Sequence, residues 1–574
     1  MKIPLTPGIR TLGGMFDSVA EQHPAGGIRS FFVDETITFR RLSQCGRRIA
    51  CNLVEAGVLP GEPVAVLIRS SLDLLQTIHG VALAGAAVMP LPLPVGTANR
   101  AFVTRLEHVI ADSAVRFVVV DDAHSDLLAA LLPQVTMLPF SPLALDSGDV
   151  TLPIVDADDL ALIQYTSGST SNPRGVALTH RNILAGIRAM QHVGRLGAGD
   201  VLCHWLPLSH DMGMFCTLAA VASGIEVRIS PPGDFIKRPD RWLRKFCDFG
   251  ATVYAGPNFS YRHLMDAVPA DEASTYDLSA ARILLNGAEP IDPTLVIRFQ
   301  QHFAPSGLLP QAMTPGYGLA EATLGVSFSL ADNEPSIDWV DRDRLNRSRE
   351  AHRVTADSVN ARGLVSCGPP VPGIEVRITL GDHCLSERVV GEIEIRGESV
   401  MNGYYRESAP TVLYGGWRST GDLGYLADGQ LYITGRSKEM LTIGGQNYYP
   451  QDIEDPVRRV AGVHKQHAVA VVLPGDESAG HTERIGVLAE VSVPISSYGA
   501  TISAIRAASA HELGGASVDV VLMRRNGLLR TTSGKFQRLL MRDRLLKGAL
   551  DNVLIHLGAG ETVATLDRSA PLLA

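Results

Sequence analysis

The stretch Leu162–His180, LIQYTSGSTSNPRGVALTH, places small hydroxyl residues and a glycine between two apolar runs. Such a backbone can wrap an anion, because its N–H and hydroxyl groups donate hydrogen bonds, and Arg174 adds a positive charge. A Walker loop would read GxxxxGK[ST] and open into a helix, whereas residues 176–178 favour a second strand. The composition leaves two interpretations open, a phosphate cradle and a flexible surface loop.

Two further segments carry side chains that suit a nucleotide. In GYGLAEATLG, the ring of Tyr317 can stack on a base, and the carboxylate of Glu321 can bind Mg²⁺ beside phosphate oxygens. In STGDLGYLADGQLYITGR, Asp422 can accept hydrogen bonds from both hydroxyls of a ribose, and Arg436 can reinforce that edge. Ordinary structural explanations are also open, since glutamates often cap helices and aspartates often mark turns.

Two other residues could act on a reacting carboxylate. Lys535 follows a glycine in LLRTTSGKFQR, where a lysine on a polar loop can deliver positive charge to an attack on phosphorus. The segment WLPLSHDMGM contains His210 and Asp211, but no Ser-His-Asp or Cys-His grouping that would indicate a hydrolase appears in the sequence. Taken singly, a surface lysine and a structural histidine are the more common explanations of these two residues.

The composition indicates a folded globular protein of at least two domains. The chain has 574 residues, 45% hydrophobic and 19% charged, and its net charge of −9 argues against a nucleic-acid binder. Its seven cysteines have no CxxC spacing, so neither a zinc site nor a disulfide framework is expected. No secretory segment or membrane-spanning apolar run is evident, and we expect a cytoplasmic protein without stable membrane insertion.

The pattern of apolar runs predicts the fold class and its division. Runs such as PVAVLI, RFVVVDD, ATVYAGP and RILLNGAEP alternate with helical patterns, which predicts a large N-terminal α/β domain with parallel-type sheets. Ligands of such sheets bind beyond the carboxyl ends of the strands. Shorter runs, IEVRITL, GEIEIRG and GQLYITG, predict a small β-rich subdomain over 363–435. We expect the N-terminal domain to span 1–435 and a smaller, mobile α+β domain to span 436–574.

The order and spacing of these segments resemble the adenylate-forming superfamily of acyl-CoA synthetases, peptide-synthetase adenylation domains and luciferases. The resemblance covers about residues 30–545. Within that superfamily, NGAEP, WLPLSHDMGM, AGPNFSY, YGLAEATLG and GGQNYYPQDIE look like the fatty acyl-AMP ligase branch. The resemblance implies that ATP converts a fatty acid to acyl-AMP with release of pyrophosphate. The acyl group then passes to the phosphopantetheine of an acyl carrier protein or of a synthase carrier domain.

The resemblance also implies roles for individual residues. The β- and γ-phosphates of ATP would lie on a loop formed by Thr166, Ser167, Gly168, Ser169 and Thr170, with Arg174 where lysine is usual. The rest of the nucleotide would contact Gly287, Ala288, Glu289, Tyr317, Gly318, Asp422 and Arg436. Glu321 would bind Mg²⁺, and Lys535 would bridge the fatty carboxylate and the α-phosphate. His210 would gate an apolar tunnel involving Met212–Leu218 and GPNFSY.

The resemblance further implies a moving C-terminal domain. Members of the superfamily rotate this domain after adenylation, about a hinge that corresponds here to Lys438. The long polar connection from Leu330 to Gly363 matches the insertion that restrains this domain in acyl-AMP ligases and disfavours coenzyme A as the acceptor. A surface excursion without a role would explain the same length.

Other functions compete with this hypothesis. A fatty acyl-CoA ligase shares the first half-reaction and finishes on free coenzyme A. A peptide-synthetase adenylation domain fits less well, because YYPQDIE and GPNFSY differ from its pattern. The arginine at position 174 leaves room for a non-catalytic nucleotide- or acyl-binding relative.

Overall fold

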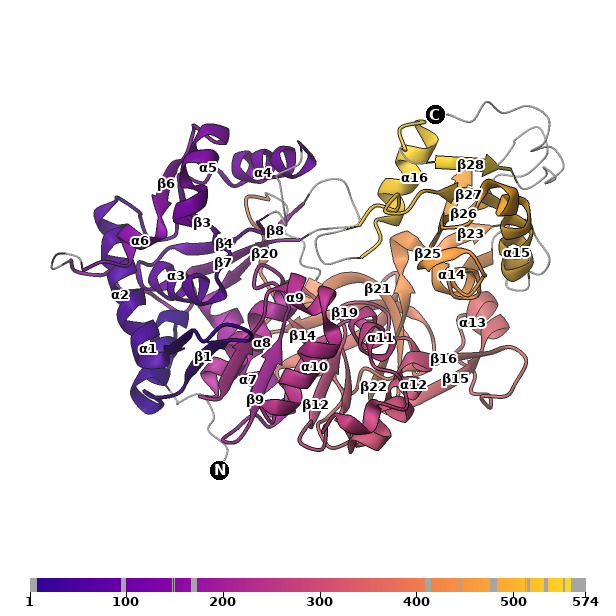
Figure 1. Cartoon of the computed structure of the whole chain (residues 1–574), viewed down its shortest axis with the longest axis horizontal. Coiled ribbons are helices and arrows are strands. Elements are labelled where there is room, and N and C mark those ends of the chain that lie inside the picture. Colours follow the sequence, from indigo (N-terminus) through magenta and orange to yellow (C-terminus); the bar gives the residue numbers. More distant parts are fainter. Residues whose placement is uncertain are drawn as a thin grey trace.

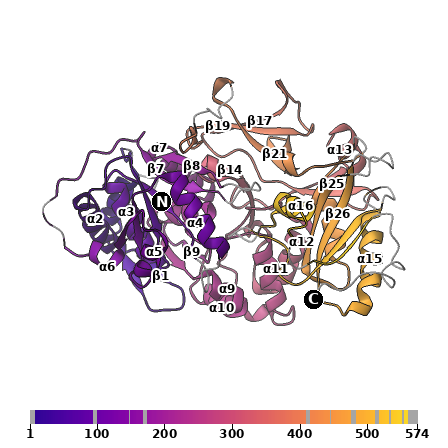
Figure 2. The same ribbon diagram turned by 90° about the horizontal axis from the view of Figure 1, so that it is seen from above.

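The computed structural model describes residues 8–93, 100–146, 148, 150–166, 173–407, 414–443, 446–474, 483–510, 513, 517–530, 535–550 and 553–558. Figure 1 shows a large N-terminal body and a smaller C-terminal body, drawn in orange and yellow, beside α13 and β21. Figure 2 shows the same two bodies from above.

The first large sheet has seven strands. In spatial order they are β20 (Gly403–Tyr404), β8 (Gly175–Thr179), β7 (Leu160–Tyr165), β4 (Ala87–Pro90), β3 (Pro63–Leu67), β5 (Phe117–Val120) and β6 (Thr136–Pro139). The strands from β7 to β6 are parallel, whereas β8 and β20 are added antiparallel. The central strands are continuous apolar runs because helices cover both faces of the sheet. The predicted strand after the phosphate-loop segment is confirmed as β8.

The second large sheet has eight strands and carries several of the predicted site residues. In spatial order they are β14 (Gly325–Phe328), β13 (Met313–Gly318), β12 (Ile283–Asn286), β11 (Val253–Gly256), β9 (Val201–His204), β10 (Glu226–Ile229), β1 (Gly27–Ser30) and β2 (Thr36–Thr38). The strands from β13 to β1 are parallel, and an antiparallel strand closes each edge. The carboxyl ends of β12 and β13 therefore lie side by side.

Helices bury the faces of both sheets. The helices that pack into the larger core are α1 (Leu12–Gln22), α2 (Phe39–Glu55), α3 (Ser71–Leu83), α6 (Phe140–Leu143), α7 (His180–Gly194), α8 (Asp211–Ala222), α9 (Pro232–Lys237), α10 (Pro239–Asp248), α11 (Asn258–Ala267) and α12 (Pro293–Phe303). A second core under the far face of the first sheet is closed by α4 (Arg100–Ser113) and α5 (Ser125–Leu131). Helix α8 is buried on all sides from its second residue onward, which explains its almost uninterrupted apolar sequence.

Short 3₁₀ turns join several of these elements. They are η1 (Asp122–His124), η2 (Ala273–Thr275), η3 (Ala304–Ser306), η4 (Pro310–Ala312), η5 (Ala320–Ala322), η6 (Tyr414–Gly416), η7 (Ser437–Glu439) and η9 (Ile495–Ser497). Two of them matter for the site, because η5 contains Glu321 and η7 contains the predicted hinge residue Lys438.

The three short runs that predicted a β-rich subdomain form strands of one antiparallel sheet. Its order is β18 (His383–Cys384), β17 (Ile374–Leu380), β19 (Gly391–Gly397), β21 (Arg418–Ala427) and β22 (Gln430–Arg436). The register pairs Asp422 with Arg436, so both predicted ribose ligands stand at one end of the β21–β22 pair.

The polar connection from Leu330 to Gly363 is more structured than its composition suggested. Strand β15 (Ile337–Asp341) pairs antiparallel with β16 (Ala361–Val365), and α13 (Arg342–Ser348) lies between them in the chain. The buried carboxylate of Asp338 accepts hydrogen bonds from Tyr425 at 2.6 Å and Arg388 at 2.8 Å, which anchors β15 to the β-rich sheet. We call residues 330–363 the excursion below.

The C-terminal body has its own sheet and its own apolar cores. The hairpin β23 (Leu441–Ile443) and β24 (Gln446–Tyr448) precedes α14 (Pro450–Arg458), β25 (Val463–Pro474), β26 (Glu483–Val491), α15 (Tyr498–Ala510), β27 (Asp519–Met523), α16 (Arg538–Leu546) and β28 (Val553–Leu557). Helices α14 and α15 cover one face of the β25-β26-β27-β28 sheet, and α16 covers the other. This is the expected small α+β unit, while its boundary near residue 436 stays a prediction.

Among the described residues, none of the helices combines the length and the apolar character that a membrane span requires.

Candidate active site

A pocket between the two bodies, here the junction pocket, brings predicted residues together from distant parts of the chain. Its lining includes His210, Gly287, Ala288, Gly318 and Lys535. Gly287 and Ala288 follow β12, and Gly318 ends β13, so the pocket lies at the carboxyl ends of parallel strands, as expected. The C-terminal body contributes Lys535 to a pocket that is otherwise built by the N-terminal body.

The charge of Lys535 is set by its surroundings in this pocket. Burial lowers the pKa of Lys535, and the nearby guanidinium of Arg436 lowers it further. The carboxylates of Asp211, Glu289 and Asp422 act in the opposite direction without cancelling the effect. Three residues that are predicted to contact the nucleotide therefore lie close enough to Lys535 to shift its pKa, namely Glu289, Asp422 and Arg436.

His210 is oriented by its neighbour in the sequence. Its Nδ1 lies 2.6 Å from Oδ1 of Asp211, at the start of α8. Burial alone would raise the pKa of Asp211, but His210, Lys535 and the Met212 N–H together hold it at about 2. Asp211 is thus ionised at neutral pH and fixes the ring of His210 at the wall of the junction pocket. The sequence placed the two residues side by side without indicating this contact.

Asp422 joins the two residues predicted to bind the nucleoside. Its Oδ2 accepts a hydrogen bond from the hydroxyl of Tyr317 at 2.6 Å, and its Oδ1 lies 3.0 Å from Nε of Arg436. Burial raises the pKa of the Tyr317 hydroxyl, and the charge of Asp422 raises it further. The bond from Tyr317 to Asp422 anchors the aromatic ring, while each carboxylate oxygen retains a second lone pair for a ribose hydroxyl.

Glu321 is held by a tyrosine that the sequence did not single out. The hydroxyl of Tyr404, on β20, donates to Oε1 of Glu321 at 2.8 Å. The guanidinium of Arg174 lies over the ring of Tyr404, 3.4 Å from its centroid, and also forms a forked ion pair with Glu407. Arg174, Tyr404 and Glu321 form one connected chain of contacts.

The phosphate-loop segment joins the antiparallel strands β7 and β8. Thr166 N–H donates to the carbonyl of Arg174 at 3.0 Å, so the two ends of the segment meet. The predicted ligands Ser167, Gly168, Ser169 and Thr170 lie outside the described residues. The planar fork of Arg174 both stacks and pairs, which a lysine ammonium does not do, and this gives the arginine at this position a structural reason.

Glu289 lies beside the junction pocket, close to Lys535. Its Oε1 accepts a hydrogen bond from the N–H of Phe259 at 3.2 Å, at the start of α11. Burial raises the pKa of Glu289, whereas Lys535, Arg458 and Arg262 oppose that shift. Its predicted part in lining adenine stays a prediction.

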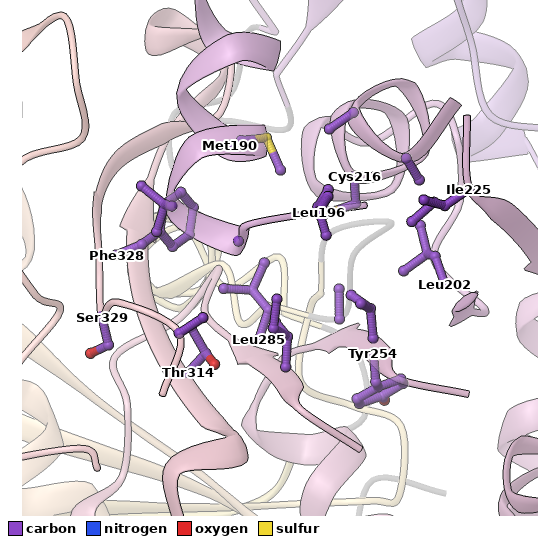
Figure 3. Close-up of a pocket in the computed structure, with 18 residues that line it drawn as sticks. Met190, Leu196, Leu202, Cys216, Ile225, Tyr254, Leu285, Thr314, Phe328 and Ser329 are labelled. Carbon is purple, nitrogen blue, oxygen red and sulfur yellow. The ribbon is translucent and has the colours of Figure 1, made fainter. Parts of the chain in front are cut away.

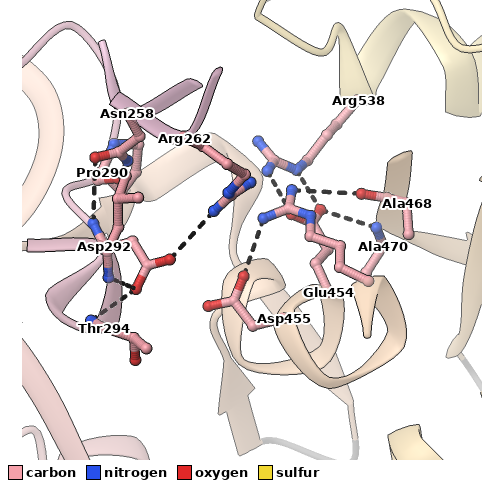
Figure 4. A network of polar contacts seen from close by, with 12 residues as sticks. Asn258, Arg262, Pro290, Asp292, Thr294, Glu454, Asp455, Ala468, Ala470 and Arg538 are labelled. Carbon is pink, nitrogen blue, oxygen red and sulfur yellow. Dashed lines mark hydrogen bonds and ion pairs between the residues drawn. The ribbon is translucent and has the colours of Figure 1, made fainter. Parts of the chain in front are cut away.

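A network of buried charges beside the pocket was not predicted from the sequence. Arg538, three residues after Lys535, donates to Oε1 of Glu454 at 2.6 Å and to Oε2 of Glu439 at 2.8 Å. Figure 4 shows Arg538 converging on Glu454 in α14, with Arg262 of α11 and Asp292 before α12 facing them. Although burial opposes ionisation, Arg538 and Arg458 lower the pKa of Glu454. Helical spacing could not have indicated this network, because α16 begins at Arg538 and Lys535 lies before the helix.

An apolar pocket adjoins the junction pocket (Figure 3). Its walls come from α7, α8 and strands of the second sheet, and include Met190, Leu202, Cys216, Ile225, Leu285 and Phe328. Leu285 and Phe328 line both pockets. Cys216, within the predicted Met212–Leu218 region of α8, lines this pocket together with Val253–Ala255 of β11, the strand that leads into the GPNFSY segment. That this pocket is the acyl tunnel stays a prediction.

A family model described as AMP-binding enzyme matches residues 16–405, and the chain belongs to this family of AMP-forming, ATP-using enzymes. It is 32% identical over 550 residues to the medium-chain-fatty-acid–[acyl-carrier-protein] ligase JamA of Moorena producens, covering 90% of this chain and 91% of the relative. It is 31% identical to the long-chain-fatty-acid–AMP ligase FadD32 of Mycolicibacterium smegmatis, with 90% of both chains covered.

A solved structure from a study of fatty acyl-adenylate ligases of E. coli and L. pneumophila matches with a TM-score of 0.88 and 30% identity, over 94% of this chain and 98% of that chain. The relatives and this structure confirm the adenylate-forming fold and the resemblance to the fatty acyl-AMP ligase branch.

The lowered pKa of Lys535 leads to a prediction about pH. If the charged lysine is required, kcat/KM for adenylation will fall as pH rises through a pKa below the ordinary lysine value of about 10.4. Lys535→Arg keeps its charge and is expected to lose this alkaline limb, although its rate is lower. The measurement is kcat/KM from neutral pH to about pH 10, with exposed Lys547→Arg as the control. An identical limb in Lys535→Arg would assign it to another group.

The stack of Arg174 on Tyr404 leads to a second prediction. Arg174→Lys keeps the charge but loses the stack and the fork, so we expect KM for ATP to rise roughly two- to fivefold with little change in kcat. Steady-state kinetics over a range of ATP concentrations provide the measurement. Arg181→Lys, which alters an ion pair with Asp158 on the surface, is the matched control. Equal KM values for Arg174→Lys and the native protein would contradict a role for the stack.

Proposed function

We propose that this protein activates a fatty acid with ATP, forming acyl-AMP and pyrophosphate, and transfers the acyl group to the phosphopantetheine of an acyl carrier protein. The observation that carries the proposal is the junction pocket, where Lys535 meets His210, Gly287 after β12 and Gly318 at the end of β13. An apolar pocket adjoins it, and such walls suit an alkyl tail. The named activities of JamA and FadD32 support the same assignment.

The nucleotide would be held by the residues around Asp422. We infer that its carboxylate takes the ribose hydroxyls while Tyr317, anchored by its own hydroxyl, stacks on adenine. The segment from Thr166 to Arg174 would hold the β- and γ-phosphates. In this arrangement the α-phosphate would lie within reach of Lys535.

Mg²⁺ would enter together with ATP. Among the described residues, no group of three or more His, Cys, Asp or Glu side chains is arranged to hold a metal ion. Mg²⁺ keeps water and takes phosphate oxygens readily, and one carboxylate is enough to complete such a site. The carboxylate of Glu321, oriented by Tyr404, fits this part. Bound Mg²⁺ would offset phosphate charge during the reaction.

Adenylation in this site is mainly positioning and charge stabilisation. The fatty carboxylate attacks the α-phosphorus in line, and pyrophosphate leaves. Lys535 stabilises the negative charge shared by the fatty carboxylate and the α-phosphate. Asp211 fixes His210 beside that carboxylate. Apolar walls keep water away from the mixed anhydride.

A fatty acyl-CoA ligase is the second candidate. The putative fatty-acid–CoA ligase FadD21 of Mycobacterium tuberculosis is 28% identical over 543 residues, which favours this alternative. Both candidates share the first half-reaction and differ in the thiol that receives the acyl group.

The proposal is tested by identifying the products. The protein is incubated with ATP, Mg²⁺ and a panel of fatty acids, and acyl-AMP is detected by mass spectrometry, before coenzyme A or a holo carrier protein is added. We expect Lys535→Ala to lower adenylation roughly 10²- to 10³-fold with ATP binding retained, whereas exposed Lys547→Ala has no effect. No acyl-AMP from any acid would refute the proposal, and preferential acyl-CoA formation would support the second candidate.

The excursion provides contacts that could restrain the C-terminal domain. Nε of Arg362 lies 3.0 Å from Oδ1 of Asp452 on α14, and its guanidinium stacks 4.1 Å from the ring centroid of Tyr449. Burial raises the pKa of Asp452, while Arg362 and Arg342 oppose that shift. Helix α13 also packs against β24. We infer that these contacts favour the orientation that places Lys535 in the junction pocket, with Lys438 as the hinge.

Weakening this restraint should change the acceptor. Arg362→Ala is expected to leave acyl-AMP formation nearly intact and to raise acyl-CoA formation about tenfold, as a bias of about 1.4 kcal/mol between two orientations would give. The two products are measured in parallel with free coenzyme A, and exposed Arg347→Ala on α13 is the control. Unchanged acyl-CoA formation, with adenylation and thermal stability preserved, would show that Arg362 does not restrain the domain.

A further inference from the structure

Phe328 lies at the boundary between the polar and the apolar part of the site. It ends β14, is 7% exposed, and lines both the junction pocket and the apolar pocket, as does Leu285 on β12. His210 and Lys535 line only the junction pocket, and Met190 and Ile225 line only the apolar one. A chain whose carboxylate lies at Lys535 and whose tail lies in the apolar pocket must pass Leu285 and Phe328.

The ring of Phe328 is held in place by two glycines. A Cβ on Gly316, its cross-strand partner, would come within 2.0 Å of Cδ1 of Phe328, and a Cβ on Gly325 would come within 2.5 Å of Cε2. Both edges of the ring therefore lie against backbone where any other residue would collide. The Cβ of Gly316 would also come within 3.2 Å of Cδ1 of Leu285, so the two side chains meet at the same glycine.

Figure 3 shows the direction that a tail would take. Phe328 stands at one end of the apolar pocket, with Leu202 and Ile225 at the other. The first carbons after the carboxylate would therefore lie at Phe328, and the distal carbons beyond it. A ring fixed on both edges cannot give way easily to a substituent on those first carbons.

We propose that Phe328, together with Leu285, forms a neck that selects acids unbranched near the carboxylate. This inference rests on the proposed function and specifies its substrate class. A straight methylene chain passes the neck, whereas a methyl branch or a ring at the second or third carbon meets the edge of Phe328. Discrimination by one methyl group in an apolar site is about 10- to 200-fold.

The test compares kcat/KM for acyl-AMP formation from decanoic acid, 2-methyldecanoic acid, 3-methyldecanoic acid and phenylacetic acid. The native protein is expected to prefer decanoic acid at least tenfold. Phe328→Ala should reduce that preference about tenfold or more, and because the preference is a ratio of kcat/KM values, a change in ATP binding common to all acids cancels. Met190→Ala, which enlarges only the apolar pocket, should alter the preference for chain length and leave the preference for unbranched acids intact.

Phe328→Leu serves as a second variant in case the larger truncation destabilises the sheet, and thermal unfolding is measured for each protein. Phe328→Leu should reduce the preference for unbranched acids by a smaller factor than Phe328→Ala. Equal use of branched and straight acids by the native protein would overturn the neck, as would a folded Phe328→Leu with unchanged preference. Failure of the proposed function is distinguished by the absence of acyl-AMP from every acid, which would remove both proposals.

Discussion

The buried carboxylate of Glu454 is the charge that anchors the start of α16, three residues after Lys535. Arg538 at the start of α16 donates hydrogen bonds to Glu454 on α14 and to Glu439 in the hinge region. One guanidinium therefore joins these three segments, and we call it the charge centre. Ions buried in this way remain stable only when each has its partner, and loss of one leaves an uncompensated charge. Lys535 precedes Arg538 by three residues, so the segment that carries it to the junction pocket is anchored at the charge centre.

The features that could be predicted from the sequence are those that depend on the residue pattern within one short segment. Apolar and polar residues alternate visibly along the strands IEVRITL, GEIEIRG and GQLYITG. The position of Gly287 and Gly318 at the carboxyl ends of strands follows from the alternation of strands and helices in an α/β domain. Tyr404 was missed because its partner Glu321 is 83 residues away in the chain. The sequence of the excursion predicted a polar connection without strands, because β15 is stabilised by pairing with β16, a contact that its own composition does not indicate.

Arg174 stands where the resemblance implies a lysine, and neighbouring side chains accommodate its guanidinium. The usual lysine acts as a mobile point charge, whereas the guanidinium here is held flat on Tyr404 and paired with Glu407. Because Tyr404 also binds Glu321, the end of the phosphate-loop segment and the expected magnesium ligand are mechanically linked.

The position of Lys535 in a chain of 574 residues also has a consequence for biosynthesis. During translation the N-terminal domains of a protein generally fold first. The strands and glycines that would hold the nucleotide are complete long before the ribosome reaches the lysine, and β20 joins the first sheet more than 220 residues after β8. A nascent or C-terminally truncated chain would therefore carry the expected nucleotide cradle without the lysine proposed to act on the α-phosphate, and we expect adenylation only once the C-terminal body has been made.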